Sequence, residues 1–204
     1  YFVKATSAAT ANYNDATSNV ATVKVVPGKV KMLGTSRTAS SVKLNWTKAT
    51  GATSYRVYYK AAGDKSYKVF KNTTATSMNV TGLASATTYT FAVKAYAKTA
   101  GYSTVYATKI TTTAPAKVAT PSVTAGSKKA TVKFTKVARA TGYQIYMAKG
   151  NGKYVKVKTT TSTSFTKTGL AKGATYKFKV RAYKTVGSNT YYGAFSSAKA
   201  VVVK

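Results

Sequence analysis

Side chains that could carry acid–base or metal chemistry are almost missing from this chain. Asp15 and Asp64 are its only carboxylate side chains, and it contains neither histidine nor cysteine. General acid–base catalysis needs a group that titrates near the working pH, usually His, Asp or Glu. Metal sites need such ligands in clusters. Two isolated aspartates provide neither, so we expect a protein that is not an enzyme and has no cofactor.

Cations dominate instead. The 204 residues include 33 lysines and arginines, which gives a formal net charge of +31. Because almost no carboxylates offset them, these cations generate a field of one sign over the whole molecule. Such a field predicts anionic partners. The alternative is that the charge only keeps the protein soluble.

A second set of side chains places tyrosines beside cations. In the runs 55–60 and 91–96, apolar residues alternate with polar ones, as in half-buried strands. If the apolar set faces a core, the other set faces solvent, and rings beside cations suit sugar rings or bases that carry phosphate or sulfate. The simpler interpretation of any one residue is a cross-strand pair that stabilises the sheet. The candidate polyanion or glycan face consists of Arg56, Tyr58, Lys60, Lys94, Tyr96, Tyr146, Lys177, Lys179, Arg181 and Tyr183.

Strands must position these residues, because helix signals are nearly absent. Thr, Val, Tyr and Ser dominate the sequence, and β-branched and aromatic residues favour strands. Short alternating runs separated by turn residues predict an all-β sandwich. With 44% hydrophobic residues the chain should bury a core, and no run reaches the apolar length of a membrane span.

The sequence also repeats itself with a period close to the length of one complete sandwich. Matching residues lie 87 or 88 positions apart, and a proline marks the start of each repeat, where a strand tolerates it. The clearest matches are Leu83 with Leu170, Tyr89 with Tyr176, Trp46 with Phe134, and Tyr55 with Tyr143.

These residues resemble the fibronectin type III family. The pattern is Val-Lys-Leu-Asn-Trp at 42–46, Gly-Ala-Thr-Ser-Tyr at 51–55, Gly-Leu at 82–83 and Thr-Tyr-Thr-Phe at 88–91, and the second repeat follows it. The resemblance implies immunoglobulin-like sandwiches in which each leucine packs near a corner tyrosine. It is specific for the fold and says little about function, because this fold hosts many roles. The predicted structural core residues are Trp46, Leu83, Tyr89, Phe134, Leu170 and Tyr176.

The repeat divides the chain into two complete units, 27–114 and 115–204. Residues 1–26 align with the last two strands, F and G, of a preceding unit, since Val-Lys-Ala at 3–5 matches 93–95. A two-stranded ribbon is at best marginally stable alone. We therefore expect a fragment of a longer array with further domains upstream; the alternative is that another chain supplies the missing strands.

The joins between units are short and contain proline, at 25–27 and 113–115. Short proline-containing joins restrict bending, so we expect tandem sandwiches arranged as an extended, semi-rigid rod. Lys- and Thr-rich tandem units of this kind resemble spacers in surface proteins and polysaccharide-degrading enzymes of Gram-positive gut bacteria. This resemblance implies an extracellular, secreted or cell-surface location.

Aromatic loops before the last strand of each unit form another candidate. The segment 189–195 contains three rings, and 101–106 and 11–15 are its equivalents. Loops at the ends of a sandwich often carry binding residues. The alternative is that these rings cover the junction between domains.

Together these observations predict a non-enzymatic structural and adhesive rod of a bacterial surface or secreted protein. Its expected partners are an anionic polysaccharide, teichoic acid or mucin-type glycan, the neighbouring domains of the same longer chain, and other copies if it self-assembles. An alternative is the passive spacer region of a secreted carbohydrate-active enzyme. A nucleic-acid-binding module is disfavoured, because the lysines are spread along every strand and not gathered in one groove.

Overall fold

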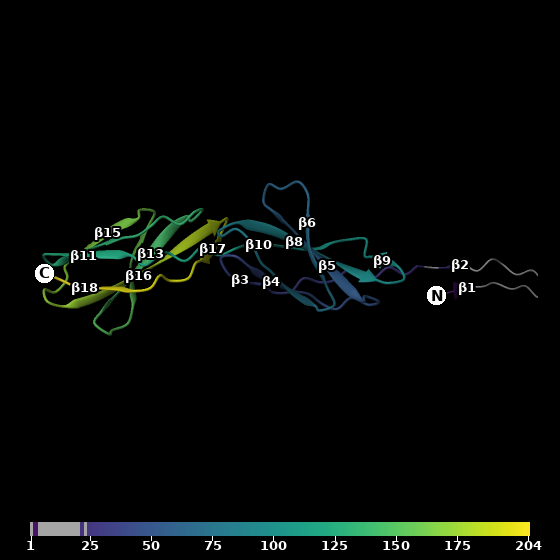
Figure 1. The fold of residues 1–204 in the computed structure, drawn as a ribbon, viewed down its shortest axis with the longest axis horizontal. Helices are drawn as coiled ribbons and strands as arrows, with labels where there is room; N and C mark the ends of the chain where they lie inside the picture. The colour runs from purple at the N-terminus through teal and green to yellow at the C-terminus, as the bar shows by residue number, and fades with distance from the viewer. Residues whose placement is uncertain (1, 4–20, 23) are drawn as a thin grey trace, which may run out of the picture.

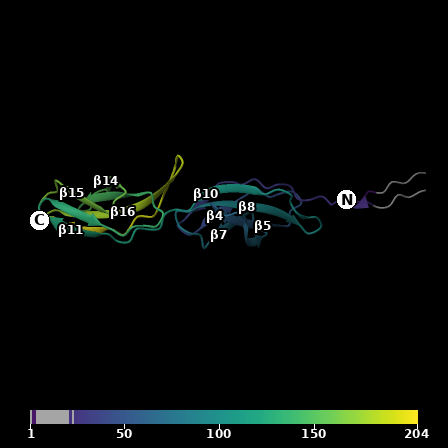
Figure 2. The same cartoon turned by 90° about the horizontal axis from the view of Figure 1, so that it is seen from above.

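Two antiparallel β-sandwiches follow one another along the chain (Figures 1 and 2). The structure is a computed structural model that describes residues 2–3, 21–22 and 24–204. None of these residues lies in a helix, so no described helix could cross a membrane. The all-β, tandem-sandwich prediction is confirmed.

The first sandwich packs a three-stranded sheet against a larger one. Its smaller sheet has the order β3-β4-β7, and its larger sheet has the order β10-β8-β5-β6 with β9 on β8. The strands are β3 (Ser36–Arg37), β4 (Val42–Asn45), β5 (Ser54–Ala61), β6 (Lys68–Thr73), β7 (Ser77–Val80), β8 (Thr88–Ala97), β9 (Gly101–Tyr102) and β10 (Ala107–Thr112).

The second sandwich repeats this plan. Its smaller sheet has the order β11-β12-β15, and its larger sheet has the order β14-β13-β16-β17 with β18 also on β16. The strands are β11 (Ser122–Gly126), β12 (Lys129–Lys133), β13 (Gly142–Lys149), β14 (Val155–Thr160), β15 (Ser164–Thr168), β16 (Thr175–Val186), β17 (Asn189–Tyr192) and β18 (Lys199–Val202).

Near the N-terminus, β1 (Phe2–Val3) pairs antiparallel with β2 (Ala21–Thr22). The rest of the expected ribbon, including Asp15 and the aromatic segment 11–15, lies outside the described residues. The assignment of 1–26 to a preceding unit stays a prediction.

The two-residue period of the strands separates a core face from an outer face. In β4, Val42 and Leu44 are fully buried whereas Lys43 is exposed. Next to β4, Trp46 is 2% exposed and meets Tyr55 edge-on, with ring centres 5.6 Å apart. In the second unit the half-buried Phe134 meets Tyr143 in the same way at 4.8 Å.

Tyrosine hydroxyls fix the loops around each core. The Tyr89 hydroxyl accepts a hydrogen bond from the Ala84 amide at 2.9 Å, and the Tyr176 hydroxyl accepts one from Ala171 at 3.2 Å. The neighbouring leucines, Leu83 and Leu170, are buried.

Each of these leucines follows a glycine that has a positive φ, 73° at Gly82 and 72° at Gly169. Glycine adopts this backbone conformation without steric cost. It lets the chain turn so that the leucine enters the core.

We expect Leu83→Ala or Leu170→Ala to lower the free energy of unfolding of its own unit by about 2–5 kcal/mol, because a buried leucine leaves a cavity. Tyr89→Phe removes one hydrogen bond and should cost about 1 kcal/mol. Urea unfolding followed by circular dichroism measures both effects. Leu33→Ala is the control, because Leu33 is 42% exposed; a Leu83→Ala variant as stable as this control would contradict the core assignment.

Candidate functional site

The outer face of the larger sheet in the first unit brings the predicted residues together. Arg56 on β5 lies directly opposite Lys94 on β8, Tyr58 lies opposite Ala92, and Ser54 lies opposite Tyr96. Directly paired residues of an antiparallel ladder share one face of the sheet. Arg56, Tyr58, Lys60, Lys94 and Tyr96 are therefore neighbours, each half-buried, on what we call the first aromatic–cation face.

Rings from the segment 101–106 fold back over this face. Tyr102 packs on Tyr96 with ring centres 4.8 Å apart, and the Arg56 guanidinium lies 4.6 Å from the Tyr102 ring centre. Tyr106 meets Tyr58 edge-on at 5.2 Å, and Lys94 Nζ lies 4.4 Å above the Tyr106 ring. The two cations that face each other across the strands are thus held by different rings.

Tyr67, in the loop between β5 and β6, completes the first face. Its ring stacks on Tyr106 with centres 5.2 Å apart, and Lys60 Nζ lies 5.2 Å from the Tyr67 ring centre. Burial, and to a smaller extent the neighbouring Tyr106, raises the pKa of Tyr67 above its usual value of 10.0. The ring is therefore neutral at ordinary pH.

The second unit carries an equivalent face on β13 and β16. Tyr146 lies opposite Lys179, Ala148 lies opposite Lys177, and Gly142 lies opposite Tyr183. Lys179 Nζ sits between two rings, 4.0 Å from the centre of Tyr154 and 4.3 Å from that of Phe195. We call this set the second aromatic–cation face.

Arg181 is held at the same face by an amide oxygen and by rings. Its Nε and Nη2 donate to Gln144 Oε1 at 2.9 and 2.8 Å, and its guanidinium lies 4.1 Å from the Tyr192 ring centre. Phe195 lies 4.9 Å from Arg181 and meets Tyr146 edge-on at 4.9 Å. Lys177 Nζ donates to Asn151 Oδ1 at 2.8 Å.

The two faces are built to one plan. Each has aromatic residues at five corresponding places: strand β5 or β13, the loop that follows it, the second half of β8 or β16, the end of the paired strand β9 or β17, and the segment beyond that strand. Ring contacts with the central cations recur in both units. The corresponding pairs are Tyr58 and Tyr146, Tyr67 and Tyr154, Tyr96 and Tyr183, Tyr102 and Tyr192, and Tyr106 and Phe195.

Sequence reasoning missed several members of these faces. Tyr67 and Tyr154 lie 87 positions apart, the same offset as the core leucines, so the repeat could have revealed them. The rings of 101–106 and 189–195 were predicted as a separate loop site, and the structure joins most of them to the sheet faces. No sequence signal marks Gln144 as the partner of Arg181.

Tyr191, on β17, is the exception among these rings because it does not lie on the second face. Its ring lies 4.8 Å from the guanidinium of Arg37, which belongs to the first unit. Nearby, a Cβ built on Gly193 would lie 2.7 Å from the carbonyl oxygen of Pro115. The segment 189–195 therefore contributes to both locations that the sequence predicted. Tyr192 and Phe195 lie on the second aromatic–cation face, and Tyr191 lies at the junction between the units.

Carboxylates contribute little to this surface. In the described part of the chain, the one salt bridge joins Lys68 Nζ to Asp64 Oδ2 at 3.8 Å, with both side chains exposed. No group of three or more potential metal-ligating side chains occurs among the described residues. Ring faces, amide oxygens and the Tyr146 hydroxyl are the groups that contact the cations on the two faces.

A protein-family model and a relative both match most of this chain. The model of the fibronectin type III domain matches residues 26–112 and 114–196. Exoglucanase B of Cellulomonas fimi is 30% identical over 218 residues, which cover 99% of this chain and 19% of that protein. The chain thus spans about a fifth of that relative's length.

A solved structure of a two fibronectin type-III domain segment from chicken tenascin also resembles the chain. It has a TM-score of 0.54 at 18% identity and covers 87% of this chain and 99% of that segment. At this identity the likeness shows the fold alone.

We expect Phe195→Leu to destabilise the second unit by about 1–2 kcal/mol, since a cation–π contact contributes about 0.5–1 kcal/mol at exposed sites and two cations lie over this ring. A double-mutant cycle of Phe195→Leu with Lys179→Met, measured by urea unfolding, isolates the contact. The same cycle with Lys199→Met is the control. Equal coupling energies in both cycles would show that Phe195 acts by packing alone.

Proposed function

The chain belongs to the fibronectin type III domain family, and we propose that it is a non-catalytic spacer segment of an extracellular bacterial protein. The match to Exoglucanase B carries this proposal, because it uses nearly all of this chain and only 19% of the enzyme. Most of that enzyme therefore lies outside the matched region. A spacer between functional parts of a carbohydrate-active protein accounts for such a match.

The chemistry of the chain supports a non-catalytic role. Glycoside hydrolysis generally requires two carboxyl groups that flank the scissile bond, about 5–10 Å apart. The sequence holds only two such side chains, and Asp64 lies in a turn, where its Oδ2 accepts from the Ala61 amide at 3.2 Å.

The join between the units supports a spacer with little freedom to bend. Thr113 is fully buried, and its Oγ1 donates to the Ala84 carbonyl at 2.7 Å. The Ala114 amide donates to the Thr38 carbonyl at 2.9 Å. The chain is therefore fixed to the first unit up to Ala114, and the contact between Arg37 and Tyr191 adds a second link across the join.

Distance measurements between two spin labels test whether the join between the units is rigid. The chain has no cysteine, so Thr74→Cys and Ser162→Cys, both at exposed sites, allow one label in each unit. We expect a narrow distance distribution that broadens when Gly-Ser-Gly-Ser is inserted after Ala114, because the inserted residues form a flexible linker. Tyr191→Ala should broaden it partly and the neighbouring Tyr192→Ala should not. If the distance distribution of the parent chain were as broad as that of the insertion variant, the proposal of a rigid spacer would be wrong.

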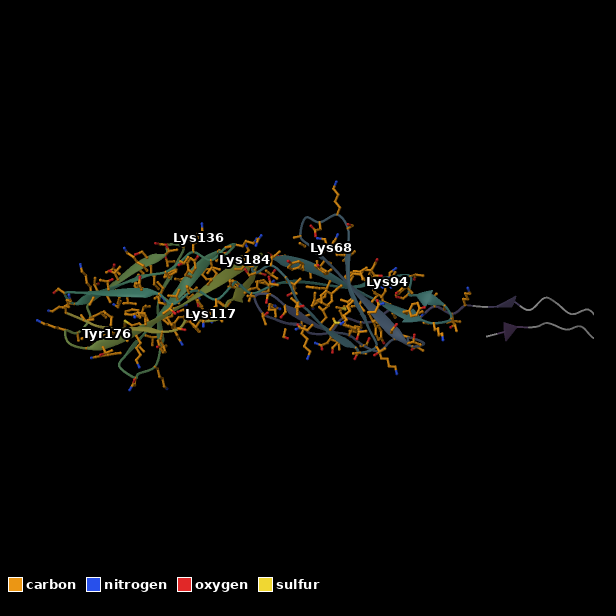
Figure 3. All side chains as sticks on the ribbon, in the orientation of Figure 1. Lys68, Lys94, Lys117, Lys136, Tyr176 and Lys184 are labelled. Atoms are coloured by element: carbon orange, nitrogen blue, oxygen red, sulfur yellow. The ribbon has the colours of Figure 1, made fainter. Side chains whose placement is uncertain are left out.

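A second role is favoured by the charge. We propose that the basic surface also holds anionic polymers, as an adhesive rod would. Lysine side chains extend along both sandwiches, including Lys68 and Lys94 in the first and Lys136 and Lys184 in the second (Figure 3). With a net charge of +31 and two side-chain carboxylates, few of these cations have an anionic partner within the chain.

Binding to immobilised heparin and to teichoic acid tests this second role. Exposed charges are screened over about 8 Å at physiological salt, so retention should fall steeply as salt is added. Retention that stays the same from low to high salt would remove the electrostatic explanation.

A further inference from the structure

We propose that each aromatic–cation face is a binding site for one class of polyanion, an acidic polysaccharide whose pyranose rings carry carboxylate or sulfate groups. This inference rests on the proposed polyanion binding and assigns it to one sheet of each unit. The opposite, three-stranded sheets would then contribute only non-specific attraction.

The cations of the faces are fixed before any ligand arrives. Lys179 Nζ lies between the rings of Tyr154 and Phe195, at 4.0 and 4.3 Å from their centres. A ring face attracts the ammonium through its quadrupole and does not neutralise the charge. The ammonium keeps its N–H donors, since its described contacts are to these ring faces. A free lysine loses rotamer entropy when it is immobilised, and here the fold has already restricted the side chain.

Each face also holds an arginine in a defined orientation. Arg181 uses Nε and Nη2 on Gln144 Oε1, and Arg56 donates from Nε to Asn72 Oδ1 at 2.9 Å. Arg181 Nη2 also donates to the Tyr146 hydroxyl at 3.3 Å, so its Nη1 group, together with both Nη groups of Arg56, remains for a ligand. Charge-assisted hydrogen bonds to carboxylate or sulfate are about twice as strong as neutral ones.

The rings favour a sugar polymer over other polyanions. Tyr106 is 36% exposed and Tyr192 is 44% exposed, and each lies within 5 Å of a cation. Tyr67 stacks on Tyr106, and a cation lies over the Tyr106 and Tyr192 rings. The C–H groups of a pyranose therefore need to contact only the part of a ring face that stays exposed, while the acidic group reaches the cation. A polyphosphate has no sugar ring to use this contact.

Nucleic acid fits these faces less well. Base stacking needs an open ring face, whereas several rings here pack against one another. Tyr58 meets Tyr106 and Tyr146 meets Phe195 edge-on, each at an interplanar angle of 85°. The exposed parts of these rings are edges and partial faces.

Duplication of the face has its own consequence. A polymer long enough to contact both units gains from an effective concentration that a single unit lacks. Affinity should therefore rise with polymer length more than the number of charges alone predicts.

Two charge-matched variants of the full chain test the inference. Lys94→Gln/Lys179→Gln removes two charges from the aromatic–cation faces. Lys43→Gln/Lys133→Gln removes two charges from exposed positions on β4 and β12, in the opposite sheets. A third variant, Tyr106→Leu/Phe195→Leu, removes the rings and leaves the charge unchanged. The melting temperature of each variant checks that it is folded.

Calorimetric titration at about 0.15 M salt measures affinity for polygalacturonate, polyphosphate, single-stranded DNA and a neutral β-glucan. For polygalacturonate, we expect the face-charge variant and the ring variant each to lose about tenfold in affinity, or ~1.4 kcal/mol. The opposite-sheet variant should lose less than about threefold. For polyphosphate, the ring variant should lose less than about threefold, because it removes the preorganisation of the cations but no contact with a sugar ring.

Three results would overturn the assignment. Equal losses for polygalacturonate in both charge variants would show that the faces are not the site. A tenfold loss of affinity for DNA or polyphosphate in the ring variant would show that the site does not select sugars, and charge-independent binding of the neutral glucan would show that acidity is not recognised. No binding of any polyanion by the parent chain would refute the proposed polyanion role itself.

Discussion

The structure depends on which groups contact the lysine and arginine side chains in a chain that has almost no carboxylates. Arg56 and Lys94 lie directly opposite each other, and like charges in that position destabilise a sheet. The Tyr102 ring contacts Arg56, and the Tyr106 ring contacts Lys94. In the second unit Gln144 occupies the place across from Arg181, and its amide oxygen accepts from the guanidinium. Aromatic faces and amide oxygens thus do here what carboxylates do on most protein surfaces.

Tyrosine has two separate roles in this structure. Four tyrosines, Tyr55, Tyr89, Tyr143 and Tyr176, are buried, and each hydroxyl accepts a hydrogen bond from a loop amide. Most of the other described tyrosines lie on the outer faces, where ring faces contact cations. The same residue type therefore stabilises both sides of the larger sheet, with its hydroxyl on the inside and its π surface on the outside.

Much of the fold and of the two aromatic–cation faces could be predicted from the sequence. The features that could not be predicted share one cause. Alternation placed Arg56 and Lys94 on an outer face because strand periodicity determines which face a residue occupies. The repeat identified Leu83 with Leu170 because the two units match in sequence. The contacts of Tyr102 with the first face and of Phe195 with the second depend on the path of the chain after β8 and after β16, which periodicity does not determine. The partnership of Gln144 with Arg181 depends on the register between β13 and β16, which is set by the whole sandwich.

Strand β17 shows how the same periodicity joins the face to the junction. Tyr191 and Tyr192 are consecutive, and successive side chains of a strand point to opposite sides. Tyr192 therefore reaches Arg181 on its own unit, while Tyr191 reaches Arg37 on the preceding one. Pairing of Tyr192 with Tyr183 and of Tyr191 with Lys184 fixes both side chains through one ladder. The ladder consists of backbone hydrogen bonds, so it holds Tyr191 at the join independently of the contacts that the Tyr192 side chain makes.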